Sequence, residues 1–129
     1  MIRWDTMDRA IELLKKYYGY DSFREGQREV IESILSGRDV LAIMPTGGGK
    51  SLCYQIPAML MEGITIVISP LISLMKDQVD TLCQIGIPSA FINSSLSYGE
   101  LKQTVYGAEN NKYKLLHLKG WSPGVLQSC

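Results

Sequence analysis

Apolar residues recur every three or four positions along several stretches of the chain, and this spacing is typical of amphipathic helices. The predicted helices span residues 7–18, 25–35, 51–61, 71–84 and 99–109. Glycine follows several of these stretches, as expected at a helix end, because it adopts the left-handed backbone without a steric penalty. Pro57 should kink its helix or lie near a break in that helix, since proline has no N–H to donate.

Short apolar runs lie between the predicted helices and indicate buried strands. They span residues 39–43, 64–68, 90–92 and 114–116. The run at 64–68 is rich in β-branched residues, which favour strands because their side chains pack well on a pleated sheet. Strands that alternate with helices predict an α/β fold, with a parallel sheet flanked by helices and preceded by N-terminal helices.

The composition of the chain excludes some classes of protein. The 129 residues include 46% hydrophobic residues, which is enough for a buried core, and 13 basic residues balance 13 acidic ones. This balance excludes a globally basic nucleic-acid binder, although it leaves room for a local basic groove. The cysteines, at positions 53, 83 and 129, have no C-x-x-C spacing and suggest neither a disulfide framework nor a zinc site.

The N-terminus carries charges where a signal peptide needs an apolar core. The longest apolar stretches, on either side of Glu62, are shorter than the ~20 residues of a membrane span. The sequence therefore predicts a cytoplasmic protein without a membrane segment, associated with the nucleoid if the source is bacterial.

A glycine-rich loop follows the predicted strand at 39–43 and precedes the predicted helix at 51–61. Its last residues are Thr46, Gly47, Gly48, Gly49, Lys50 and Ser51. Glycines let backbone N–H groups turn toward phosphate oxygens, and the following helix N-terminus favours the same anion. Lys50 would contact the β- and γ-phosphates and the Ser51 hydroxyl would bind Mg²⁺, which makes both residues catalytic candidates. The strict P-loop pattern has glycine where this chain has Met44, so a flexible glycine-rich turn is the alternative.

The variant from Met44 to Ser51 resembles the first motif of superfamily-two helicases, and specifically that of the RecQ family. Residues 23–27 (FREGQ) and residues 69–78 (SPLISLMKDQ) resemble further RecQ motifs at the family's spacing. The resemblance covers about residues 8–116 and implies a RecA-like domain of an ATP-dependent 3′–5′ DNA helicase. It also implies ATP and Mg²⁺ as cofactors, and single-stranded and forked DNA as partners.

Residues 23–27, preceded by Tyr18-Gly19-Tyr20, are similar to the adenine-recognition motif of the RecQ family. By that resemblance the amide of Gln27 pairs with the adenine edge, since it carries both a donor and an acceptor. Tyr20 and Arg24 both have planar groups that could hold the adenine ring between them. Phe23 is better interpreted as a core aromatic at a helix junction, and Tyr20 has the same alternative interpretation.

Residues 69–78 lie along the path of single-stranded DNA in the RecQ family. They follow a predicted strand and open a predicted helix, which places them at the carboxyl edge of the sheet, where ligands bind. The candidate DNA-binding residues are Ser69, Pro70, Leu71, Ser73 and Lys76. Pro70 and Leu71 would shape the loop, the serines would reach phosphates, and Lys76 would supply a cation. A solvated helix face is an equally good interpretation of Lys76 and Asp77.

The chain departs from the family after residue 116, where the RecQ pattern continues into Pro-Glu-Arg-Leu. Residues 117–122 can be encoded CAC-CTG-AAA-GGC-TGG-AGT, and these bases read from the third position give Pro-Glu-Arg-Leu-Glu. We therefore expect a RecA-like part at residues 1–116 and an aberrant, frameshifted or truncated tail at residues 117–129. A true divergent terminus is the alternative, and the open reading frame would decide between the two.

No Asp-Glu-x-His motif follows the P-loop in this sequence, so the carboxylates that complete the Mg²⁺ site of a helicase are missing. The resemblance also implies a second RecA-like domain with an arginine finger, and we expect neither within these 129 residues. The sequence therefore predicts a helicase portion that is inactive by itself. The alternatives are a stand-alone P-loop nucleotide-binding module and another P-loop NTPase or kinase.

Overall fold

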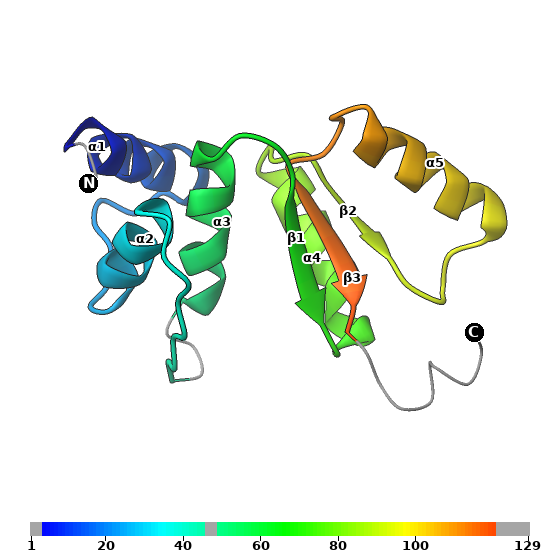
Figure 1. Cartoon of the computed structure of the whole chain (residues 1–129), viewed down its shortest axis with the longest axis horizontal. Coiled ribbons are helices and arrows are strands. Elements are labelled where there is room, and N and C mark those ends of the chain that lie inside the picture. Colours follow the sequence, from blue (N-terminus) through cyan, green and yellow to red (C-terminus); the bar gives the residue numbers. More distant parts are fainter. Residues whose placement is uncertain (1–3, 46–48, 121–129) are drawn as a thin grey trace. The chain divides into compact units, whose positions relative to one another are not determined.

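The computed structural model describes residues 4–45 and 49–120, which belong to two compact units, Met1–Glu62 and Gly63–Cys129 (Figure 1). The described part of the first unit is built from helices. They are α1 (Trp4–Leu13), the π-helix η1 (Leu14–Tyr18), α2 (Gln27–Leu35) and α3 (Lys50–Leu60). The helices predicted in this part of the chain are therefore confirmed within a few residues at each end.

Apolar side chains from these helices form the core of the first unit. The buried cluster contains Met7, Ala10, Leu14, Ile31, Leu52 and Ile56. Phe23 packs against this cluster from the loop between η1 and α2, which confirms its interpretation as a core aromatic. Pro57 lies inside α3 but near its end, since the helix stops at Leu60 and the Met61 N–H donates to the Pro57 carbonyl oxygen at 2.9 Å.

The strand predicted at residues 39–43 is wrong. These residues form neither helix nor strand, and the side chains of Leu41 and Ile43 are 89% and 90% exposed. A strand needs a neighbour for its backbone N–H and C=O groups, and residues 39–43 are paired with none of the described strands. The glycine-rich loop is therefore reached through irregular chain, although the helix expected after it is present.

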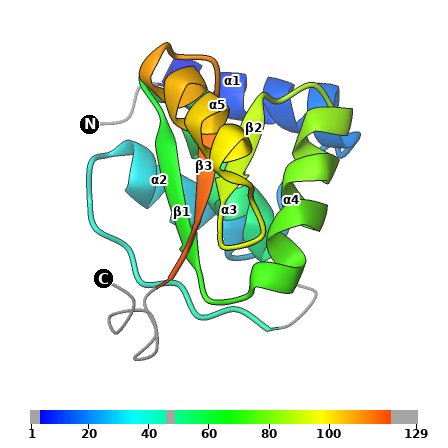
Figure 2. The ribbon, with the colours of Figure 1, turned by 90° about the vertical axis from the view of Figure 1, so that its right-hand side faces the viewer.

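The second unit is a three-stranded parallel sheet whose strands are connected through helices (Figure 2). Its elements are β1 (Thr65–Ser69), α4 (Ile72–Gln84), β2 (Ser89–Ile92), α5 (Tyr98–Glu109) and β3 (Leu115–Lys119). The strand order is β1-β3-β2, so the last strand lies between the first two. Leu115 accordingly pairs with Thr65 on one side and with Ser89 on the other. The predicted α/β class and parallel sheet are confirmed.

The two described helices of the second unit pack against the sheet, mainly against strand β2. Helix α4 packs against β2 and β3, and α5 packs against β2 (Figure 2). A capping box starts α5, in which the Glu100 N–H donates to the Ser97 Oγ at 3.2 Å and the Ser97 N–H donates to the Glu100 carboxylate at 3.0 Å. Among the described residues, no helix is both long and apolar enough to cross a membrane.

His117 lies in the central strand β3, and its side chain is 0% exposed. Burial lowers its pKa below the ordinary value, because the charged imidazolium is poorly solvated there. Strand β3 continues to Lys119, past the boundary expected after residue 116, and the Gly120 N–H donates to the Ser69 carbonyl oxygen at 2.7 Å. Residues 121–129 lie outside the described residues, so an aberrant tail at 117–129 stays a prediction.

Candidate functional site

The end of the glycine-rich loop meets the N-terminus of α3 in the first unit. Gly49 is the N-cap residue of α3 with a left-handed backbone (φ 77°), and Lys50 and Ser51 form the first turn with exposed side chains. The N–H groups of a first turn have no partner within the helix, and the helix dipole favours an anion there. Outside the described residues lie Thr46, Gly47 and Gly48. The expected phosphate contacts of this loop therefore stay predictions.

Gly49 also contacts the side chain of Gln27. The Nε2 of Gln27 donates to the Gly49 carbonyl oxygen at 3.1 Å. A Cβ atom on residue 49 would overlap that nitrogen. Glycine is therefore required here for two separate reasons, its left-handed backbone and the close approach of Gln27.

The 19–26 loop, which joins η1 to α2, carries two of the residues expected to hold adenine. Tyr20 is 52% exposed, and the side chain of Arg24 is exposed as well. Gln27 begins α2, is 2% exposed, and its Oε1 accepts a hydrogen bond from the Arg24 backbone N–H at 2.8 Å. The two ends of the Gln27 amide thus join this loop to Gly49. Contacts of these residues with adenine stay predictions.

A second connection to α3, made by the residue just before the 19–26 loop, was not foreseen from the sequence. Tyr18, the last residue of η1, donates its hydroxyl hydrogen to the Oε1 of Gln55 in α3 at 2.6 Å. Burial, together with the nearby Tyr54, raises the pKa of Tyr18, so its hydroxyl keeps the hydrogen that it donates. A glutamine on the buried face of a helix is the sequence signal that could have revealed the pair, because buried amides need partners.

Met44 stands where the strict P-loop pattern has glycine, and it packs beside Cys53 of α3. The Cys53 Sγ lies 3.7 Å from the Met44 Sδ and 4.0 Å from the Gly49 carbonyl oxygen. Burial raises the pKa of the Cys53 thiol, which therefore stays protonated and acts as a small apolar group. The departure at residue 44 thus has a packing role on the helix that carries Lys50.

The predicted DNA segment begins at the carboxyl end of β1, in the second unit. The Ser69 Oγ accepts a hydrogen bond from the Leu71 N–H at 3.2 Å, which fixes the turn ahead of α4. Ser69 is half-buried, whereas Pro70, Leu71 and Ser73 are exposed. The segment therefore lies at the carboxyl edge of the sheet, as predicted, and its contacts with DNA stay predictions.

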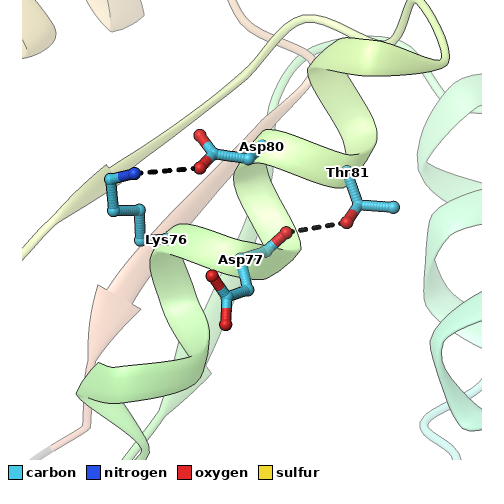
Figure 3. A network of polar contacts seen from close by, with 4 residues as sticks. All are labelled: Lys76, Asp77, Asp80 and Thr81. Atoms are coloured by element: carbon cyan, nitrogen blue, oxygen red, sulfur yellow. Dashed lines mark hydrogen bonds and ion pairs between the residues drawn. The ribbon is translucent and has the colours of Figure 1, made fainter.

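Lys76 lies on the exposed face of α4, where its Nζ forms an ion pair with the Oδ2 of Asp80 at 3.1 Å (Figure 3). On the same helix the Thr81 hydroxyl donates to the Asp77 carbonyl oxygen at 2.8 Å. An exposed pair between residues one turn apart contributes little stability, because water solvates both charges. Lys76 and Asp77 thus lie on a solvated helix face, and a contact of Lys76 with DNA stays a prediction.

Few protein ligands for Mg²⁺ are present among the residues that the structure describes. The described part of the chain contains no group of three or more His, Cys, Asp or Glu residues that could hold a metal ion. The exposed hydroxyl of Ser51, in the first turn of α3, is the ligand that the sequence predicts. Mg²⁺ usually binds to one or two protein oxygens together with substrate phosphates and water. Ser51 therefore fits such a site as one ligand of an ion that a nucleotide brings with it.

Comparisons with known proteins agree with the family resemblance. Residues 24–128 match the family model of DEAD/DEAH box helicases. The chain is 54% identical over 113 residues to the ATP-dependent DNA helicase RecQ of Bacillus subtilis, an alignment that covers 87% of this chain and 19% of the relative. It is 49% identical over 117 residues to the RecQ helicase of Synechocystis sp., covering 91% of this chain and 24% of the relative. The chain therefore spans less than a quarter of the length of either relative, and the resemblance to RecQ helicases is confirmed.

Proposed function

Since the chain belongs to the DEAD/DEAH box helicase family, we propose that it is the N-terminal portion of an ATP-dependent 3′–5′ DNA helicase of RecQ type. Its similarity to proteins named as ATP-dependent DNA helicases supports this proposal. The observation that carries it is the amide of Gln27, which joins the predicted adenine loop to the last glycine of the predicted phosphate loop. One side chain thus links the two halves of a nucleotide site.

ATP would bind to the first unit. Lys50 supplies a cation for the β- and γ-phosphates, and the first turn of α3 adds backbone N–H donors. Tyr20 and Arg24 enclose the adenine ring, and the Gln27 amide pairs with its edge. The Gln27 Nε2 carries two hydrogens, so one can donate to the Gly49 carbonyl oxygen while the other donates to the adenine edge. Binding of the base is thereby coupled to the phosphate loop.

Mg²⁺ would be held by the Ser51 hydroxyl together with the nucleotide phosphates, whose negative charge it partly neutralises. Two residues would position the phosphates that bind the ion. Gly49 contributes through its left-handed backbone, and Lys50 contributes through its positive charge.

Single-stranded DNA, free or at a fork, would bind to the second unit along the turn from Ser69 to Ser73 and the first turns of α4. Lys76 would exchange its ion pair with Asp80 for one with a backbone phosphate. Contacts with phosphates carry no sequence information. Such contacts suit an enzyme that must move along DNA of any sequence.

Binding measurements test this proposal. We expect the chain to bind ATP in the presence of Mg²⁺, measured by calorimetry, and to bind a labelled single-stranded oligonucleotide, measured by fluorescence anisotropy. Lys50→Ala removes the cation that faces the phosphates, so it should abolish ATP binding and leave DNA binding unchanged. Lys16→Ala, at an exposed lysine of the same unit, is the matched control.

ATP binding without DNA binding would favour the alternative of a stand-alone nucleotide-binding module. Unchanged ATP affinity in Lys50→Ala would contradict the phosphate site itself.

A further inference from the structure

We propose that the hydrogen bond between Tyr18 and Gln55 positions the 19–26 loop on helix α3 and thereby determines how well the chain selects adenine among the nucleotide bases. The inference rests on the proposed nucleotide site in the first unit. It assigns a role to Tyr18, which lies in the segment that resembles the adenine motif, and to Gln55, which follows the glycine-rich loop in α3. Both are positioning residues, since they act through Tyr20 and through Arg24, whose backbone N–H holds the Gln27 amide that pairs with the adenine edge.

The 19–26 loop is tied to α3 at both of its ends. At its start, Tyr18 donates to Gln55 at 2.6 Å, and Gly19 then turns the chain with a left-handed backbone (φ 74°). At its end, Gln27 donates to the carbonyl oxygen of Gly49, the N-cap residue of α3, at 3.1 Å. The helix that begins with Lys50 thus anchors both ends of the loop.

The Tyr18 bond is costly to lose, because its acceptor is buried. Gln55 is 6% exposed, so little water can replace the tyrosine hydroxyl as a partner for its amide oxygen. The Tyr18 ring packs against the apolar core of the first unit, which directs its hydroxyl toward α3. Tyr18 also ends a π-helix, a wide turn that is found often at functional sites.

The bond separates base recognition from phosphate recognition. Tyr20 and Arg24 follow Tyr18 closely in the chain, so their positions depend on where the loop leaves η1. Gly49 and Lys50, by contrast, are placed by α3 itself. Loss of the Tyr18 hydroxyl should therefore weaken the binding of adenine and leave the binding of the phosphates unchanged.

The test compares three ligands in the full chain, each with Mg²⁺: ATP, GTP and inorganic tripolyphosphate. Tyr18→Phe removes one hydroxyl and keeps the ring, and we expect ATP affinity to fall about three- to tenfold. The affinities for GTP and tripolyphosphate should stay unchanged. Tyr17→Phe, at the adjacent half-buried tyrosine, is the matched control and should leave all three affinities unchanged.

A second variant shows whether the loss of ATP affinity comes from the hydrogen bond or from another property of Tyr18. Gln55→Met keeps the length of the side chain but removes its acceptor, so it should reproduce the loss of ATP affinity. The double variant Tyr18→Phe/Gln55→Met should lose no more than either single variant, because both remove the same hydrogen bond.

Equal losses for ATP and tripolyphosphate would overturn the inference, because they would show a general structural defect. If the unmodified chain prefers ATP to GTP and Tyr18→Phe keeps the same preference, the inference is overturned but the proposed adenine site is not. An unmodified chain that binds ATP no better than GTP would overturn the proposed adenine site and this inference with it.

Discussion

Residue 49 is subject to two constraints that can be separated by mutation. Its left-handed backbone is unfavourable for any residue with a Cβ atom, and such an atom would also displace the Gln27 amide. The other described glycines of the first unit, Gly19, Gly26 and Gly37, carry only the first constraint. Gly37 has a similar φ of 85°, but a Cβ atom on this residue would have no neighbouring atom within 4 Å.

Gly49→Ala is therefore expected to impair nucleotide binding as well as stability. Backbone strain should lower the free energy of unfolding by about 1–2 kcal/mol, and displacement of Gln27 should reduce ATP affinity. Gly37→Ala should show a similar loss of stability with unchanged ATP affinity. Urea titration and calorimetry measure the two quantities, and equal ATP affinities in the two variants would contradict the role of the Gln27 contact.

Gln27→Ala should weaken the binding of ATP and ADP about tenfold and spare nucleotides with other bases. A site built to hydrogen-bond one base loses its discrimination when the polar partner is removed. The ratio of ATP to GTP affinity, measured by competition against a fluorescent nucleotide, is the decisive readout. An equal weakening for both nucleotides would show that Gln27 acts through its contacts with Arg24 and Gly49 alone.

Motif spacing was sufficient to nominate the residues of the candidate site, because each motif is local in sequence. It could not reveal contacts between distant segments. The bonds from Gln27 to Gly49 and from Tyr18 to Gln55 join residues that only the packing of helices brings together. The same reason explains why the partner of Met44, which is Cys53, was not foreseen.

At the scale of elements, helices were predicted more reliably than strands. A helix satisfies its hydrogen bonds within its own segment, so an amphipathic pattern such as that of α4 is nearly sufficient to predict it. A strand depends on its neighbours. The runs at 64–68 and 114–116 lie in β1 and β3, which pair with each other. The equally apolar run at 39–43 has no described strand beside it.

The central strand β3 makes the stability of the second unit dependent on pH. His117 is the single histidine of the chain, and burial lowers its pKa in the folded state. Below about pH 6.5 the unfolded chain therefore binds a proton that the folded chain resists. Stability should be fully present above that pH and should be lost progressively as the pH falls toward the folded-state pKa.

The urea midpoint of unfolding at pH 7.5 and at pH 5.5 measures this effect, and it should be lower at pH 5.5. His117→Gln, which cannot titrate, should show a smaller difference between the two pH values. An identical pH dependence in both proteins would assign the effect to other groups.

At the scale of the whole molecule, apolar side chains are exposed on both units. Leu41 and Ile43 lie on irregular chain in the first unit, and Ile66 and Ile68 point outward from β1 in the second. Unpaired strand edges and contiguous apolar surface are the features that promote association between chains. The 129-residue chain by itself is therefore expected to be poorly stable, to bind a hydrophobic dye and to unfold over a broad transition.

The same chain is expected to hydrolyse no ATP in response to DNA. Phosphoryl transfer to water needs a carboxylate pair that completes the Mg²⁺ site and orients the attacking water, and no Asp-Glu pair follows Lys50 in the sequence. The exposed Ser51 hydroxyl supplies one ligand, and the described residues contain no metal-binding carboxylate cluster to supply the others. Phosphate release, measured in a single turnover with and without single-stranded DNA, should stay at the uncatalysed level in both cases. A sharp cooperative melt together with DNA-stimulated turnover would contradict this expectation, because it would show that residues within this chain can activate water without that pair.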